Sequence, residues 1–300
     1  MPAELEIIGT LLALVSLYIG GDSFVDNARE LGKKRGISSK SIGAYLLSLG
    51  AVIDEFAVIF VASFHRYGDI SFGTLQGSNI VTMGIFLIVL PFAFLGKYKR
   101  FLRDGLILMV ASLVLLAMAF AYNVVPWYMG IPIALIFFFY IYTGRSESPQ
   151  IEEEYIRVEY SPLSIIVSIV LLGFASEAIV NYTNGLSLFF NISPFVSGFI
   201  ITGFAGSLPE IIMFLLGIKK GDQDVTLGIV AGSTLYKATL IMGFTTMFGI
   251  IDLKVGIWSI YLMIILSAIF LMFTIARVTR KMAAIPVVGI ALFAAIYLLL

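Results

Sequence analysis

Long apolar stretches, most of them close to 20 residues, follow one another along almost the whole chain and are separated by short polar segments. A helix of about 20 residues crosses the hydrocarbon core of a bilayer, because each residue adds about 1.5 Å to its length. The pattern therefore predicts an all-α membrane protein with ten transmembrane helices. The predicted spans lie at residues 5–28, 37–64, 74–95, 105–122, 124–143, 163–184, 193–218, 225–248, 255–276 and 283–300.

Basic residues are distributed unevenly between the two sides that these spans define. Of the 19 Lys and Arg residues, all except Arg66, Lys237 and Lys254 lie in or beside the loops that follow the odd-numbered spans. The positive-inside rule places those loops in the cytoplasm. Because the number of spans is even, both termini are expected to be extracellular, in a multi-pass protein of the cell membrane.

One connection differs from the others in length and charge. Residues 144–160 are rich in glutamate and are interrupted by Pro149. This segment divides the spans into two groups of five. We predict a first five-helix half at residues 1–143, an acidic cytoplasmic linker at residues 144–160 and a second five-helix half at residues 161–300.

Composition narrows the function classes. The chain is 60% hydrophobic and 13% charged, its formal net charge is zero, and it has one histidine and no cysteine. Nothing in this balance favours nucleic-acid binding, and disulfides and thiolate metal sites are excluded. We expect no enzyme and no cofactor, because no nucleophile–base pair or metal-binding triad is apparent. The first apolar run lacks the basic leader and cleavage site of a signal peptide, so it is read as a true span.

The chain contains an internal repeat. A shift of 155 residues aligns residues 17–82 with residues 172–237, and Glu55 then falls on Glu210 and Asp22 opposite Glu177. Five spans separate equivalent positions, so the second copy crosses the membrane in the opposite sense. Two inverted five-helix repeats are an architecture of secondary transporters, with the substrate site near the midplane where the repeats meet.

Glu55 and Glu210 are the leading candidates for binding. Each lies in the middle of a predicted span, where an ionisable group is costly and usually functional. Gly206 and Pro209 precede Glu210 and predict a broken helix whose freed carbonyls can bind a cation. Such an oxygen-rich site suits Ca²⁺ or Na⁺. The alternative is a pair of buried acids held by hydrogen bonds between helices.

Three further acids remain open in their roles. Asp54 lies about 100° around the helix from Glu55 and shares its face only in part. Asp54 is therefore read either as a direct ligand of the cation or as a residue that does not bind it directly. Asp22 and Glu177 fit either a polar contact or vestibule wall, or a place on the ion pathway.

Hydroxyl groups mark the equivalent motifs that open the third and eighth spans. Ser78 and Thr82 share one helical face, as do Ser233 and Lys237. The serines are expected to bind a cation through their hydroxyls. The glycines before them are expected to allow close helix packing.

These motifs resemble the repeat signature of the cation/calcium exchanger superfamily, whose members include sodium/calcium exchangers. That signature reads roughly Gly-Thr-Ser-Leu-Pro-Glu, followed by Gly-Ser-Asn-Ile-Phe-Asn/Asp. The second repeat keeps Ser207-Leu-Pro-Glu210 and Gly232-Ser233, and the first keeps Glu55 and Gly77-Ser78-Asn79-Ile80. The resemblance covers nearly half of the chain. It implies that transported ions are surrounded by the residues Glu55, Glu210, Ser78, Ser233 and Ser207.

The chain departs from this signature in both repeats. The hydroxyl pair is replaced by Ala51-Val52, the proline by Asp54, and the closing Asn/Asp positions by Thr82 and Lys237. Fewer oxygen ligands and one amine result. Lys237 is read either as a tethered cation, with a route to proton coupling, or as a permanent salt bridge that locks the site. In both readings its ammonium should pair with Glu55, Glu210 or Asp54.

The resemblance implies a secondary active antiporter that exchanges Ca²⁺ or a related cation for Na⁺ or H⁺ by alternating access. The first and sixth spans would slide beside the site, and Lys237, Thr82, Asp22 and Glu177 are candidates for coupling or gating. The alternatives are a proton-coupled exchanger of another cation and a non-transporting sensor or scaffold with a degenerate site. The expected partners are inorganic cations and the lipid bilayer, and the oligomeric state is left open.

Overall fold

The computed structural model describes residues 3–34, 52–144, 161–220 and 223–299, and its elements follow the predicted spans closely. The part of the second predicted span before residue 52 and the predicted linker lie outside the described residues. The elements of the first half are α1 (Ala3–Lys34), α4 (Ile53–Phe64), α5 (Gly68–Ala93), β1 (Gly96–Lys97), η2 (Lys99–Phe101), α6 (Leu102–Ala121), η3 (Trp127–Met129) and α7 (Gly130–Gly144).

The second half continues the same helical pattern. Its elements are α8 (Pro162–Phe190), α9 (Pro194–Ser197), η4 (Gly198–Gly203), α10 (Phe204–Lys220), α11 (Gln223–Leu235), η5 (Tyr236–Ile241), α12 (Met242–Phe248), η6 (Leu253–Gly256), α13 (Ile257–Ile275), β2 (Arg277–Val278), η7 (Arg280–Ala283) and α14 (Ala284–Leu299). Within the described ranges, seven helices are long and apolar enough to cross a membrane, and the shorter apolar segment Trp127–Thr143 adds to them. The predicted class, an all-helical membrane protein, is confirmed.

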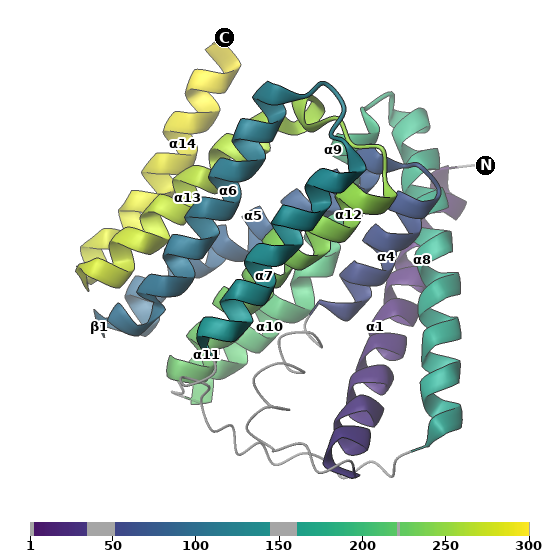
Figure 1. The fold of residues 1–300 in the computed structure, drawn as a ribbon, viewed down its shortest axis with the longest axis horizontal. Coiled ribbons are helices and arrows are strands. Elements are labelled where there is room, and N and C mark those ends of the chain that lie inside the picture. Colours follow the sequence, from purple (N-terminus) through teal and green to yellow (C-terminus); the bar gives the residue numbers. More distant parts are fainter. Residues whose placement is uncertain (1–2, 35–51, 145–160, 221–222, 300) are drawn as a thin grey trace.

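Two long helices form one edge of the bundle. Helices α1 and α8 lie side by side at one edge (Figure 1) and pack along much of their length. Hydrogen bonds between polar side chains link α1 to α8 near one end of the two helices. Asn27 Nδ2 donates to Ser164 Oγ at 3.1 Å, and Ser168 Oγ donates to Ser23 Oγ at 2.9 Å. Each hydrogen bond joins the first half of the chain to the second.

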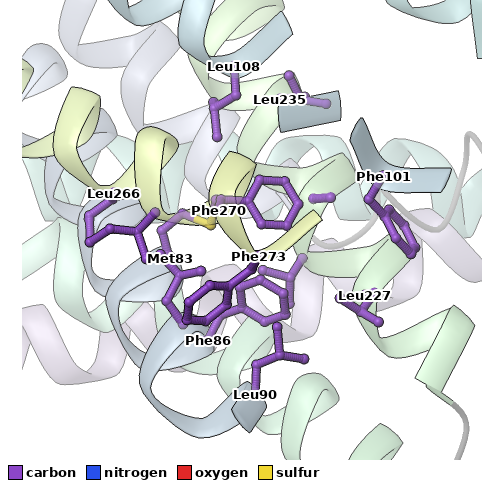
Figure 2. Packing of buried hydrophobic residues seen from close by; sticks show 14 of the residues in the cluster. Met83, Phe86, Leu90, Phe101, Leu108, Leu227, Leu235, Leu266, Phe270 and Phe273 are labelled. Atoms are coloured by element: carbon purple, nitrogen blue, oxygen red, sulfur yellow. The ribbon is translucent and has the colours of Figure 1, made fainter. Parts of the chain in front are cut away.

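The main apolar core lies among α5, α6, α11 and α13. Figure 2 shows aromatic and aliphatic side chains of this core interlocking, and Phe86 contacts Phe214 and Phe270 edge to face. Large apolar side chains also cover the outside of the molecule, such as Leu12, Phe138 and Phe174. Such an exterior suits a lipid environment rather than water.

The two halves meet closely where α5 crosses η4. A Cβ added to Gly77 would lie 2.4 Å from the carbonyl oxygen of Phe199, and one added to Gly203 would lie 2.9 Å from the Cα of Gly77. No side chain larger than hydrogen fits there, so the packing role expected for Gly77 is confirmed. The contact brings the residues after Gly77 against α10.

The predicted helix break at Pro209 is wrong. Helix α10 runs from Phe204 to Lys220 with Pro209 inside it, and the irregular backbone is the π-helical η4 immediately before it. A second π-helical segment, η5, contains Lys237. Proline is tolerated in transmembrane helices where neighbouring helices hold the backbone. Pro209 still has no N–H to offer the carbonyl of Ala205.

Contacts between loops of the two halves, and between the equivalent helices α6 and α13, strengthen the link between the halves. Strands β1 and β2 pair antiparallel and join the connection after α5 to the one after α13. In the membrane-spanning part, Ser112 Oγ of α6 and Ser267 Oγ of α13 lie 3.4 Å apart. These serines differ by the same 155 positions as the sequence repeat. The repeat therefore extends beyond the segment in which it is visible in the sequence.

Candidate cation-binding site

Five polar side chains from four transmembrane segments meet in the interior. Glu55 comes from α4, Ser78 and Thr82 from α5, Glu210 from α10 and Lys237 from η5. All five are at most 2% exposed. Residues of both repeats contribute, as inverted-repeat transporters require of a central site.

Lys237 lies between the two glutamates. Its Nζ is 2.6 Å from Glu210 Oε2, 3.3 Å from Glu55 Oε2 and 2.6 Å from Ser78 Oγ. The expected pairing of this lysine with the central acids is confirmed. An ammonium group surrounded by two carboxylates and a hydroxyl occupies the kind of oxygen-lined position that a metal cation takes.

Two hydroxyls donate hydrogen bonds to the carboxylates. Ser78 donates to Glu55 Oε1 at 2.5 Å, and Thr82 donates to Glu210 Oε2 at 2.6 Å. The shared helical face of Ser78 and Thr82 is thus the face that meets the acids. Among the described residues, Glu210 Oε1 has no hydrogen-bond partner. Glu55 Oε2 likewise has no hydrogen-bond partner among these residues and lies 3.3 Å from Lys237 Nζ. Glu210 Oε1 is therefore free to accept a further ligand.

The other two serines of the sequence prediction lie in the same region but bond differently. Ser207 donates to the carbonyl of Phe204 at 2.7 Å, and Ser233 donates to the carbonyl of Val230 at 3.2 Å. Both are fully buried. Their hydroxyls are engaged with their own helices, so binding by Ser207 and Ser233 stays a prediction.

Asp54 borders a cavity that also reaches Glu55 of the Lys237 cluster. Its Oδ1 accepts the backbone N–H of Glu55 at 2.9 Å, and its side chain borders a cavity of about 540 Å³ between α1, α4 and α10. The cavity reaches Asp22 on α1 and also touches Glu55. A place on this cavity fits both readings of Asp22, so its role stays a prediction.

Glu177 has a different environment from its repeat partner Asp22. Its Oε2 lies 3.0 Å from His65 Nε2, at the end of α4, and its Oε1 accepts from Asn181 at 3.1 Å. The His65 and Glu177 side chains are 50% and 43% exposed. Glu177 thus makes an exposed contact between α8 and α4.

Several features of this region have no clear sequence signal. The hydroxyls of Thr74 and Thr202 hydrogen-bond across α5 and η4, and both line the cavity beside Glu55. A Cβ at Gly206 would lie 2.7 Å from Glu55 Oε1, so the lack of a side chain there admits the carboxylate. The alignment across the repeat misses the threonine pair because the two residues are not at equivalent positions.

The family can be assigned from the sequence itself. The family model described as sodium/calcium exchanger protein matches residues 5–144 and residues 160–300. The chain belongs to the sodium/calcium exchanger protein family. The two matched segments correspond to the two halves on either side of the acidic segment. The chain is accordingly a membrane transporter of the cation exchanger type and not an enzyme.

Relatives of this exchanger family occur in archaea and bacteria. The chain is 26% identical over 234 residues to an uncharacterized membrane protein of Methanocaldococcus jannaschii, covering 75% of this chain and 76% of that protein. It is 24% identical over 262 residues to the inner membrane protein YrbG of Escherichia coli, covering 81% and 78%. A sodium/calcium exchanger of Methanosarcina acetivorans is 37% identical over 114 residues, which are 37% of this chain and 32% of that protein.

Solved structures share the fold of this exchanger family member. The sodium-calcium exchanger NCX_Mj superposes with a TM-score of 0.63 at 22% identity, covering 98% of this chain and 99% of the other. The H⁺/Ca²⁺ exchanger CAX superposes with a TM-score of 0.72 at 15% identity, covering 98% and 86%. The predicted fold class, an all-helical membrane protein with two exchanger repeats, is thereby confirmed.

Proposed function

We propose that this exchanger is a secondary active antiporter for Ca²⁺ or a related cation, driven by Na⁺ or H⁺. The observation that carries the proposal is the pair Glu55 and Glu210, two carboxylates from opposite repeats held in one buried cluster. Buried acids inside a transporter bundle mark the path of an ion. Carboxylate and hydroxyl oxygens are hard ligands, which favours Ca²⁺, Na⁺ or related ions over soft metals.

The same geometry supports alternating access. The cavity beside Glu55 extends along α1 to Asp22, while the contact between His65 and Glu177 joins α4 to α8. On the predicted topology, Asp22 lies on the cytoplasmic side of Glu55, and His65 lies on the extracellular side. The arrangement fits a state that is open toward the cytoplasm. Movement of the peripheral helices α1 and α8 would expose the site to the other side.

A proton-coupled exchanger of another cation is the second candidate. The amine of Lys237 stands where the family signature has an oxygen ligand, so fewer oxygens are available to hold several Na⁺ ions. The related fold of the H⁺/Ca²⁺ exchanger CAX is compatible with either driving ion. A non-transporting sensor or scaffold would retain the fold and have no ion flux.

Flux into proteoliposomes tests the proposal. Gradients of Na⁺, K⁺ and H⁺ are imposed one at a time, and uptake of Ca²⁺, Mn²⁺ and Mg²⁺ is followed. We expect one gradient to drive uptake, and Glu55→Gln and Glu210→Gln each to abolish it, because each removes a carboxylate from the central cluster. Glu4→Gln is the control, since Glu4 is exposed in the first turn of α1. Normal flux in both central variants, or no flux under any gradient, contradicts the proposal.

The predicted orientation has a separate test. Single cysteines replace His65 and Lys99 in this cysteine-free chain, and intact cells are treated with an impermeant thiol reagent. Because basic loops remain in the cytoplasm, the cysteine at 65 should react and the one at 99 should be protected. Permeabilised cells provide the control for accessibility. The reverse labelling pattern would show that both termini are cytoplasmic.

A further inference from the structure

The centre of the site already holds a positive charge that belongs to the chain. Lys237 Nζ lies within 3.3 Å of oxygens from Glu55, Glu210 and Ser78, and Lys237 is fully buried. These oxygens come from α4, α10 and α5. A second cation placed at the same point would meet the ammonium at contact distance, where like charges repel strongly in a dry interior.

The cavity wall next to this centre offers a second set of oxygens. Asp54 and Glu55 border the cavity, as do Thr74, Thr202 and Ala205. Glu55 Oε2 lies 3.3 Å from Lys237 Nζ and has no hydrogen-bond partner in the described part of the chain, although Glu55 is only 2% exposed. The carbonyl of Ala205 receives no hydrogen bond from Pro209, which has no N–H. The rest of the wall is largely apolar, which makes this group of oxygens distinct.

Asp54 and Lys237 balance one another in charge. Both residues depart from the exchanger signature. Asp54 replaces its proline, and Lys237 replaces its closing Asn or Asp. Lys237 adds one positive charge to the pair Glu55 and Glu210, and Asp54 adds one negative charge beside it. Together the four residues carry the same formal charge as the two glutamates alone. The charge available to a divalent cation is thus kept, and it is displaced toward the cavity.

We propose that Lys237 is a permanent, tethered occupant of the central position. The exchanged cation, a hard mono- or divalent ion, binds beside it at the cavity wall. Its ligands there are the carboxylates of Asp54 and Glu55, the hydroxyls of Thr74 and Thr202 and the Ala205 carbonyl. The proposal rests on the proposed antiport function and locates the ion within it. It makes Asp54 a binding residue, and it limits the chain to one exchanged cation at a time.

Calorimetric titration of the purified, full-length protein tests both parts. Ca²⁺, Mn²⁺ and Na⁺ are the probes. The natural chain should bind one ion of the preferred probe, and Asp54→Asn should weaken that binding by about tenfold or more, because one of two charged ligands is lost. Thr202→Val should weaken it by a smaller factor. The control is Thr246→Val, since Thr246 is equally buried, donates to its own helix at Met242 and lies outside the cavity.

Lys237→Thr provides the complementary measurement. It places at 237 the residue found at the equivalent position 82, so the centre loses its built-in charge. The number of bound ions should rise from one to two. Binding of two ions by the natural chain would overturn the proposal without any variant, even if Lys237→Thr fails to fold.

The titrations distinguish a failure of this inference from a failure of the proposed function. If Glu55→Gln abolishes binding while Asp54→Asn stays within about threefold of the natural affinity, the ion binds centrally and the inference is wrong. The antiport function then stands. If the natural chain binds none of the three probes, the function and the inference fail together.

Discussion

The two repeats supply the same kinds of residues to the centre but connect them differently. In the first repeat, the Ser78 hydroxyl donates to Glu55 of its own repeat at 2.5 Å. In the second, the equivalent Ser233 donates to the Val230 carbonyl. Glu210 instead accepts hydrogen bonds from Thr82 and Lys237, each at 2.6 Å. Residues that are equivalent in the sequence repeat therefore do not make equivalent hydrogen bonds.

Lys237 accounts for much of this difference. The contact of Thr82 with Glu210 and that of Lys237 with Glu55 are equivalent under the repeat, and the second is the longer, at 3.3 Å. The lysine side chain reaches past the position of a threonine hydroxyl and binds both acids. A symmetric pair of sites is thereby converted into one linked cluster in which Glu210 carries the shorter ion pair.

The largest effect should come from removing the closer acid. Glu210→Gln leaves the buried ammonium with the more distant Glu55, and breaking such a pair costs about 3–5 kcal/mol. Glu55→Gln leaves the 2.6 Å pair intact, so its cost should be nearer about 1–3 kcal/mol. Thermal unfolding of both variants in the same detergent measures the difference. Equal losses, or a larger loss for Glu55→Gln, would show that Lys237 does not favour Glu210.

A smaller difference should separate the two serines. Ser78→Ala removes a hydroxyl that donates to Glu55 and accepts from Lys237, so it should cost about 1–3 kcal/mol. Ser233→Ala removes only a bond to a helix carbonyl and should cost less than about 1 kcal/mol. Each substitution is the matched control of the other, because both serines are fully buried and differ only in their partners. Equal costs would contradict the asymmetry of the cluster.

Much of the fold can be read from the sequence, because the bilayer restricts what an apolar segment can do. About 20 apolar residues must form a helix to satisfy their backbone in lipid, and basic loops fix the predicted orientation. The central acids can also be found, since charge inside a span has few explanations other than function. Glu55, Glu210 and Lys237 meet as their burial cost requires.

The sequence is less informative where the direction of a side chain decides which partner it contacts. Whether a buried serine bonds an acid or its own helix depends on a single rotamer, and both choices satisfy the hydroxyl. Ser78 takes the first and Ser233 the second. Pro209 predicts a break that packing against neighbouring helices prevents. The pairing of Thr74 with Thr202 depends on how closely α5 and η4 approach, which local sequence does not determine.

The smallest effect should come from the acids of the two peripheral helices. Glu177 pairs with His65 at 3.0 Å, but both side chains are about half exposed, whereas the equivalent Asp22 lines the cavity. Exposed ion pairs contribute about 0–1 kcal/mol, because water screens the charges and ordering the side chains costs entropy. Glu177→Gln should therefore lower the stability by less than about 1 kcal/mol, and Asp22→Asn should change it no more.

The same limit applies to exchange. If the pair holds one side closed, its loss can shift the balance between the two access states by at most about fivefold, the factor that corresponds to about 1 kcal/mol. Flux in Glu177→Gln should change by no more than that factor, in contrast to its loss in Glu210→Gln. Thermal unfolding and proteoliposome flux on the same preparations measure both quantities. Complete loss of flux in Glu177→Gln with a normal unfolding temperature would make Glu177 part of the ion pathway. The ion would then require a charged residue outside the central cluster as well.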